Sequence, residues 1–212
     1  MPVIERIYRM RITHPTSAGL TPENILQPSF GASGSALRQV TLIVAATGFV
    51  ALCAHISVPL PFTLVPLTLS TFAVVLLGMV MGPAAGFATM ALYLAEGAAG
   101  LPVFSPHGAG GLAQLLGPTA GYLFSYPLAA ALVGSMVRGL KPVRSQMARA
   151  MVAGATTTVL ILAMGAAWLG FAFHLHSGTA WTMGVAPFLP GEAIKIVAAA
   201  GIFTTLERWK RA

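Results

Sequence analysis

Apolar residues along the chain fall into long runs, and short stretches rich in proline, glycine or basic residues separate them. A helix needs about 20 predominantly apolar residues to cross a bilayer. The pattern therefore predicts an all-α fold, an integral membrane bundle of six transmembrane helices. The second, third and sixth runs are short for a full crossing. The expected spans are 37–56, 66–81, 84–99, 119–137, 150–171 and 191–206.

The composition agrees with a protein that folds in lipid. Hydrophobic residues make up 56% of the 212 residues, charged residues make up 8%, and the mean hydropathy is +0.81. Soluble domains carry roughly a quarter charged residues. We therefore interpret residues 37–206 as a membrane domain that binds a substrate. Residues 1–36 lack the apolar core of a signal peptide and are interpreted as a cytoplasmic tail, and residues 207–212 as a basic cytoplasmic C-terminus.

Basic residues predict the orientation of the helices. Six spans place both termini on one side of the membrane. Eleven of the 12 lysines and arginines lie before or at the start of the first span, between the fourth and fifth spans, or after the sixth. Cytoplasmic segments carry an excess of lysine and arginine, so we expect an N-in/C-in protein of the bacterial cell membrane. Because topology accounts for the net charge of +7, we expect no nucleic-acid partner.

Lys195 is the twelfth basic residue, and topology does not account for it. It lies near the outer end of the sixth span, three residues after Glu192 in FLPGEAIKIV, so the two side chains share a helix face. Ionisable groups within a membrane are costly and mark functional sites. A pair that only neutralises itself is the alternative, but exposed pairs of this kind contribute only ~0.3–0.5 kcal/mol. We expect Lys195 to attract an anionic ligand and Glu192 to keep the lysine charged and oriented, or to accept a ligand N–H.

Tyr93 and Gly97 lie four residues apart in the third span and share a face. A tyrosine can stack on a flat ligand and hydrogen-bond to it, and a glycine lets a ligand approach the backbone. The alternative for Tyr93 is an aromatic residue at the membrane interface. Glu96, between them, is interpreted as a solvated helix end.

Several kinds of catalytic site are absent from the sequence. The chain has no aspartate, so an Asp-assisted triad is excluded. His174 and His176 are two apart and would not face each other on a helix, which makes them a poor metal motif. GAGGLAQLLG lacks the GK[ST] ending of a phosphate-binding loop. We expect a protein that is not an enzyme, has no metal or cofactor of its own, and uses ATP only through partner subunits.

Four blocks of sequence resemble one family. PLPFTLVPLTLSTFAVVLLGMVMGP, LYLAEGAAGLPVF, GGLAQLLGPTAGYLFSYPLAAALVG and FLPGEAIK are similar to the BioY family, the biotin-specific substrate-binding subunits of energy-coupling factor transporters. The resemblance covers about residues 37–206. It implies a six-helix membrane subunit that binds biotin near its outer face and works with a transmembrane coupling subunit and two cytoplasmic ATPases.

The resemblance also implies roles for individual residues. Glu192 stands where the family pattern PGD-x-x-K has an aspartate. In the first helix, an Ala-x-x-x-Ala motif that meets the coupling subunit matches Thr47 and Ala51, and small residues at this spacing let helices approach closely. The implied biotin contacts are Tyr93, Gly97, Glu192, Lys195, Gly86 and Thr89.

The loops 57–65 and 101–118 contain enough glycine and proline to close over a ligand as lids. Two alternatives to a biotin-binding subunit remain. One is a self-sufficient membrane carrier or channel for biotin or another small carboxylic acid. Against it, the carboxylates lie at helix ends, and no inverted repeat of the kind found in ion-coupled carriers is visible. The second alternative is an intramembrane enzyme that acts on lipids. Only the outer histidines and Glu96 favour it.

Overall fold

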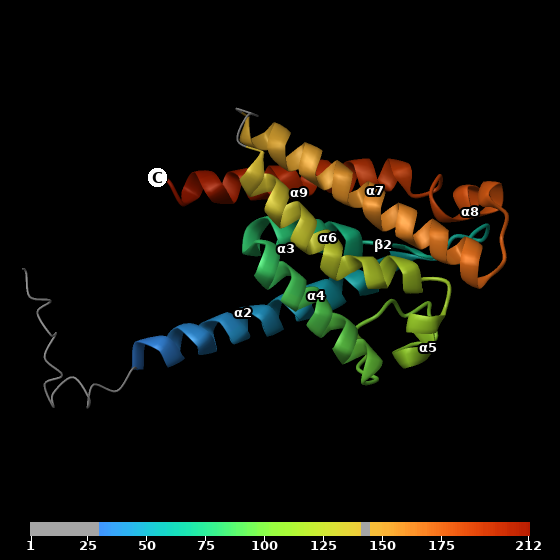
Figure 1. The fold of residues 1–212 in the computed structure, drawn as a ribbon, viewed down its shortest axis with the longest axis horizontal. Helices are drawn as coiled ribbons and strands as arrows, with labels where there is room; N and C mark the ends of the chain where they lie inside the picture. The colour runs from blue at the N-terminus through green and yellow to red at the C-terminus, as the bar shows by residue number, and fades with distance from the viewer. Residues whose placement is uncertain (1–29, 141–144) are drawn as a thin grey trace, which may run out of the picture. The chain divides into compact units, whose positions relative to one another are not determined.

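The computed structural model of the chain describes residues 30–140 and 145–212. Most of the predicted tail, residues 1–36, lies outside the described residues. Residues 39–212 form one compact unit, and every contact discussed below lies within it. In chain order the elements (Figure 1) are α2 (Phe30–His55), β1 (Ser57–Val58), β2 (Leu67–Thr68), α3 (Ser70–Met81), α4 (Pro83–Ala98), α5 (Gly111–Leu116), α6 (Ala120–Gly139), α7 (Gln146–Ala172), α8 (Ser177–Gly184) and α9 (Leu189–Trp209).

Each of the six predicted apolar runs corresponds to one helix. In chain order these helices are α2, α3, α4, α6, α7 and α9. Local signals set several of the helix starts. Pro83 and Pro190 occupy the first turns of α4 and α9, where the missing N–H of proline has no consequence. Ser145 caps α7 by accepting a hydrogen bond from the backbone N–H of Ala148. The all-helical prediction is confirmed, apart from one short ladder.

That ladder explains the largest difference from the predicted bounds. The second run was expected to be helical from residue 66, but α3 begins at Ser70. Leu67 and Thr68 instead pair with Val58 and Ser57 as the antiparallel strands β2 and β1. The short helices α5 and α8 also lie in segments that the sequence predicts as loops, because six and eight residues are too few to show a helical period.

Four of the described helices are long and apolar enough to cross a bilayer: α2 from Ala36, α6, α7 and α9. The other two are shorter, with 12 residues in α3 and 16 in α4. At 1.5 Å per residue, α3 alone covers only about 18 Å. Helix length therefore supports a multi-pass membrane protein, and the number of six spans stays a prediction.

The distribution of side chains is that of a protein in lipid. Large apolar side chains such as Leu52 on α2, Val159 on α7 and Ile194 on α9 point outward and are exposed. Polar side chains such as Thr71 and Glu192 are buried instead and hydrogen-bond to each other. With lipid as the surrounding solvent, outward apolar residues carry no penalty, and inward polar residues can find partners.

Glycines allow α6 to pack closely against its neighbours (Figure 1). A Cβ on Gly78 of α3 would lie 2.4 Å from Val133 Cγ1, and one on Gly134 of α6 would lie 2.7 Å from the Gly78 carbonyl oxygen. On the other side of α6, a Cβ on Gly165 of α7 would lie 2.1 Å from the Tyr122 ring. Small residues at these crossings bring α3, α6 and α7 together around the pocket described next.

Candidate ligand-binding site

A pocket of about 550 Å³ lies among the helices and the loops that follow α2 and α4. Its polar wall consists of Thr68, Ser70, Thr71, Ser105, Gln114, Thr119, Glu192 and Lys195, and its aromatic wall of Tyr93, Tyr122, Tyr126 and Phe188.

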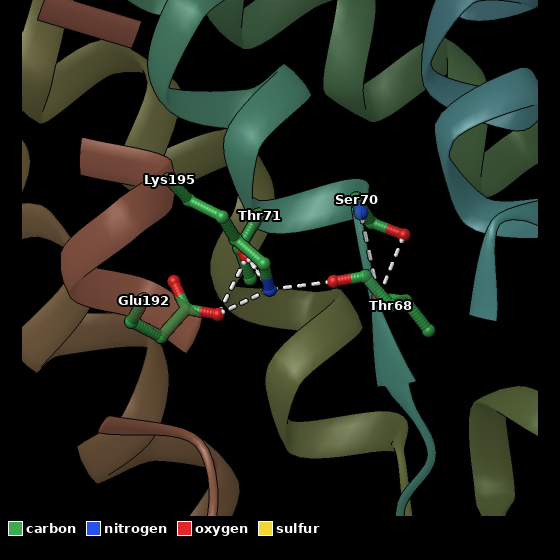
Figure 2. A network of polar contacts seen from close by, with 5 residues as sticks. All are labelled: Thr68, Ser70, Thr71, Glu192 and Lys195. Carbon is green, nitrogen blue, oxygen red and sulfur yellow. Dashed lines mark hydrogen bonds and ion pairs between the residues drawn. The ribbon is translucent and has the colours of Figure 1, made fainter. Parts of the chain in front are cut away.

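The charged pair, Glu192 and Lys195, lies in the wall of this pocket. Figure 2 shows the two side chains within a network of polar contacts. Glu192 and Lys195 project from the first two turns of α9, and both are buried, with 4% and 9% of their surfaces exposed. Lys195 Nζ lies 2.7 Å from Glu192 Oε1. A carboxylate in the first turn of a helix also interacts favourably with the helix dipole.

Two threonines complete the polar network (Figure 2). An ammonium group has three N–H donors. Lys195 donates to Glu192 Oε1, to Thr71 Oγ1 at 3.0 Å and to the carbonyl oxygen of Thr68 at 2.5 Å. The Thr71 hydroxyl in turn donates to Glu192 Oε1 at 2.8 Å. These three bonds fix the lysine side chain in position, and a ligand acceptor that binds it takes over one of them.

The aromatic wall is held by backbone carbonyls. Tyr93 is fully buried, and its hydroxyl donates to the carbonyl oxygen of Val103 at 3.0 Å. The Tyr122 hydroxyl donates to the carbonyl oxygen of Gly184 at 2.6 Å, and its ring lies against Gly165. Because these side chains are fixed before a ligand enters, the pocket offers flat apolar surfaces in defined positions.

The loop after α4 covers one side of the pocket. Phe104 packs edge-on against Tyr93, with 5.4 Å between the ring centroids. Ser105 Oγ is buried in the pocket wall and has no hydrogen-bond partner among the described residues. The same loop is joined to the loop after α2 by a contact of 2.9 Å between Ser57 Oγ and His107 Nδ1. The two segments expected to act as lids therefore touch each other beside the pocket.

Of the predicted ligand contacts, Tyr93, Glu192 and Lys195 line the pocket together. Gly97 does not, because the Phe104 ring lies over it, and a Cβ there would be 2.0 Å from Phe104 Cζ. Gly97 acts on the site indirectly, by letting the loop approach α4.

Gly86 and Thr89 lie outside the pocket wall as well. Gly86 packs against Gly78 of α3 and Ala130 of α6. The Thr89 hydroxyl is fully buried and donates to the carbonyl oxygen of Ala85 at 2.8 Å. In this structure both residues serve the packing of α4.

The predicted partner-contact pair lies on the inner side of α2. Thr47 is 2% exposed, and its hydroxyl lies 2.8 Å from the carbonyl oxygen of Val44 and 3.0 Å from Glu96 Oε1. Ala51 is half-buried against the hydrophobic core. Glu96 is thus half-buried and hydrogen-bonded to Thr47 rather than a purely solvated helix end.

Sequence reasoning missed Thr68, Thr71, Tyr122 and Tyr126. One signal was available for the tyrosines, since residues four apart in a helix share a face. For the threonines the signal was weaker: LTLST places three hydroxyl groups directly before an apolar run. Their partners, Glu192 and Lys195, lie more than a hundred residues further along the chain.

No group of three or more histidine, cysteine, aspartate or glutamate side chains suited to a metal ion occurs in the part of the chain that the structure describes. The pocket combines one buried ion pair, hydroxyl groups and aromatic rings. Such a site can bind a small organic molecule that has a charged or polar end and a flat apolar body.

A buried pocket of this kind, inside a multi-pass helical protein, defines a membrane protein that binds a small molecule. The model of the BioY family matches residues 23–212, and the chain belongs to this family. The probable biotin transporter BioY of Pyrococcus horikoshii is 32% identical over 170 residues, which cover 80% of this chain and 96% of the relative. The biotin transporter BioY of Thermotoga maritima is 34% identical over 172 residues, which cover 81% and 97%.

The fold is also similar to a crystal structure of the S-component for biotin from an ECF-type ABC transporter. The TM-score is 0.74 at 24% sequence identity, and the match covers 82% of this chain and 93% of that chain. The resemblance drawn from the sequence blocks is therefore confirmed. BioY is a family of transporter subunits and not of enzymes, which agrees with the sequence prediction.

Proposed function

We propose that this chain is the biotin-binding membrane subunit of an energy-coupling factor transporter that takes up the vitamin. Its relatives are named as biotin transporters, and the similar crystal structure is of an S-component for biotin. The observation that carries the proposal is the Glu192–Lys195 ion pair in the wall of a pocket with aromatic sides.

The chemistry of biotin suits this pocket. Biotin has a carboxylate tail and a neutral, flat ureido ring. We assign the carboxylate to Lys195, the one lysine or arginine among the residues that line the pocket in the described part of the chain. Charge-assisted hydrogen bonds to a carboxylate are the strongest that such a site offers. Glu192 holds the ammonium group while the pocket is empty, and the N-terminal end of α9 adds positive potential beside it.

Of the other proposed ligand residues, Tyr93 contacts the ligand directly, and the rest act by positioning the residues around the pocket. Tyr93 provides a ring face in the pocket, and Gly97 lets Phe104 and its loop cover that ring. Gly86 and Thr89 lie in the packing of α4 and support the position of Tyr93. On this helix Tyr93 lies about two turns after Gly86 and about one turn after Thr89. The loops after α2 and α4 act as lids whose contact at Ser57 and His107 closes over the ligand.

The experiment is a thermal-unfolding assay of the purified full chain with and without biotin. Biotin should raise the unfolding temperature of the wild type. Lys195→Ala should abolish the rise. Lys210→Ala should leave it intact, because Lys210 forms the same kind of pair in an exposed position at the end of the same helix. No response of the wild type to biotin refutes the ligand assignment.

The proposed partners are a transmembrane coupling subunit and two cytoplasmic ATPases, which supply the ATP hydrolysis. The chain itself needs no cofactor in this proposal. Thr47 and Ala51 on α2 are the proposed contact with the coupling subunit. Because Thr47 is covered by its contact with Glu96, the accessible small residue beside the pair is Gly48, whose Cα has open space around it.

The proposed topology has six spans with both termini in the cytoplasm of a bacterial cell. Residues 1–36 form the N-terminal tail and residues 207–212 the basic C-terminal end. Arg138, Arg149 and Arg211, from three different segments, line one cavity at the ends of α6, α7 and α9, which supports a common cytoplasmic side.

A further inference from the structure

A second cavity, of about 490 Å³, lies where the end of α6, the start of α7 and the end of α9 meet. It shares no lining residue with the ligand pocket. Three arginines line it, Arg138, Arg149 and Arg211, together with the carboxylate of Glu207. Three positive charges and one negative charge leave a formal charge of +2 in its wall.

The carboxylate in this wall already has a partner. Glu207 Oε1 lies 2.7 Å from Lys210 Nζ, so it does not neutralise the arginines. Arg138 is held in place, since its Nη1 donates to the carbonyl oxygens of Gly134 at 2.9 Å and Met79 at 3.4 Å.

Arg149 carries the clearest sign of a missing partner. Its Nε is buried and has no hydrogen-bond partner among the described residues. A buried N–H without an acceptor is costly and calls for an acceptor outside the described residues. Arg149 also lies in the first turn of α7, a 27-residue helix whose N-terminal end favours anions.

The surroundings indicate where such an anion comes from. α6, α7 and α9 are each long and apolar enough to cross a bilayer. Because the cavity lies at the ends of these helices, we expect it at the depth of lipid headgroups. Its floor is apolar, made by Val137 and Phe203. Trp209, the last residue of α9, is 77% exposed, as expected for an aromatic residue at the membrane interface.

We propose that this cavity binds the phosphodiester headgroup of an anionic phospholipid. The planar guanidinium of arginine matches phosphate oxygens in a two-bond geometry. Basic pockets between transmembrane helices are known to bind acidic headgroups. Arg149 Nε donates to a phosphate oxygen, Arg211 closes the rim, and the apolar floor receives the glycerol end of the acyl chains. The inference does not depend on the ligand of the other pocket.

The test is native mass spectrometry of the full chain in a non-ionic detergent, titrated with phosphatidylglycerol, phosphatidylcholine or inorganic phosphate. The wild type should retain phosphatidylglycerol in preference to phosphatidylcholine. Arg149→Gln and Arg211→Gln should each weaken retention by about tenfold or more. Arg149→Lys keeps the charge but loses Nε and should also bind less. Arg208→Gln is the control, since Arg208 lies at the same helix end, is exposed and does not line the cavity.

Each outcome decides the proposal. Equal weakening in all three glutamine variants would mean general surface charge and would overturn it. Inorganic phosphate that binds as tightly as phosphatidylglycerol would assign the cavity to free phosphate instead. If the wild type shows no preference for phosphatidylglycerol, the lipid proposal is wrong. If Arg149→Gln then also fails to co-purify with the coupling subunit, the cavity is a contact for an acidic protein segment. An unchanged circular-dichroism spectrum and unfolding temperature show that the variants are folded, whatever the ligand of the other pocket is.

Discussion

Lys195 and Glu192 form an ion pair of 2.7 Å in the wall of the ligand pocket. A second pair with the same spacing and the same distance, Lys210–Glu207, lies at the C-terminal end of the same helix, α9, and Lys210 is the first residue after it. The side chains of the first pair are 10% and 5% exposed, and those of the second are 59% and 26% exposed. The two pairs have the same spacing and the same N–O distance, and they differ in burial.

Breaking the buried pair should destabilise the protein more than breaking the exposed pair. Lys195→Met leaves the Glu192 carboxylate buried without its cation, which should lower the free energy of unfolding by about 3–5 kcal/mol. Lys210→Met should lower it by less than about 1 kcal/mol. Denaturant unfolding in detergent, followed by circular dichroism, measures both values.

The double variant Glu192→Gln/Lys195→Met is the control for this prediction. It removes both charges and should recover most of the lost stability, but it should not bind biotin. If the two lysine variants are equally stable, the buried pair has no special energetic role.

Gly97→Ala should disturb the lid over the pocket. The new Cβ would overlap the Phe104 ring, so the loop must move away from Tyr93. Overpacking of this kind costs about 1–3 kcal/mol, and biotin should dissociate faster because its cover is displaced. Stopped-flow measurement of biotin release tests this. Gly201→Ala on α9 is the matched control, because a Cβ there would meet open space. If Gly97→Ala releases biotin at the same rate as this control, the loop does not act as a lid.

Tyr122→Phe removes the hydroxyl that holds the aromatic wall. The buried hydrogen bond to the Gly184 carbonyl is lost, and an acceptor is left unsatisfied, so stability should fall by about 1–3 kcal/mol. Ser135→Ala removes an exposed hydroxyl on the same helix and should change stability by less than about 0.5 kcal/mol. Thermal unfolding compares the two variants, and equal effects would argue that Tyr122 is not held as described.

Labelling of single cysteines should reveal the proposed topology. In a background in which the buried Cys53 is replaced by alanine, Ser177→Cys and Trp209→Cys place thiols on exposed residues of α8 and at the end of α9. In intact cells, a membrane-impermeant maleimide should react with the first and not with the second. Reaction of Trp209→Cys from outside would contradict the C-in orientation.

The sequence predicted the helices well where an apolar run ended at a proline, a glycine or a charged segment. It placed the start of the second span too early, because the pairing of Leu67–Thr68 with Ser57–Val58 depends on contacts across a turn and not on local preference. Tertiary pairing of this kind leaves no hydrophobic period in so short a segment.

Only the part of the candidate site that lies within one helix could be predicted from the sequence. Glu192 and Lys195 are three residues apart in a helix, so their shared face follows from helix geometry alone. Thr68 and Thr71 reach the same point from a different segment, and only the packing of α3 against α9 brings them there. Gly97 was expected to meet a ligand, but Phe104 occupies that space, which spacing within α4 gives no means to foresee.

The most direct measurement is a calorimetric titration of the purified protein with biotin and with biotin methyl ester, which lacks the negative charge. The wild type should bind biotin at least about tenfold more tightly than the ester, because only the acid gives Lys195 a charged partner. In Lys195→Gln the difference between the two ligands should disappear. Equal affinities of the wild type for acid and ester, or a ligand difference that survives in Lys195→Gln, would contradict the assignment of Lys195 to the carboxylate.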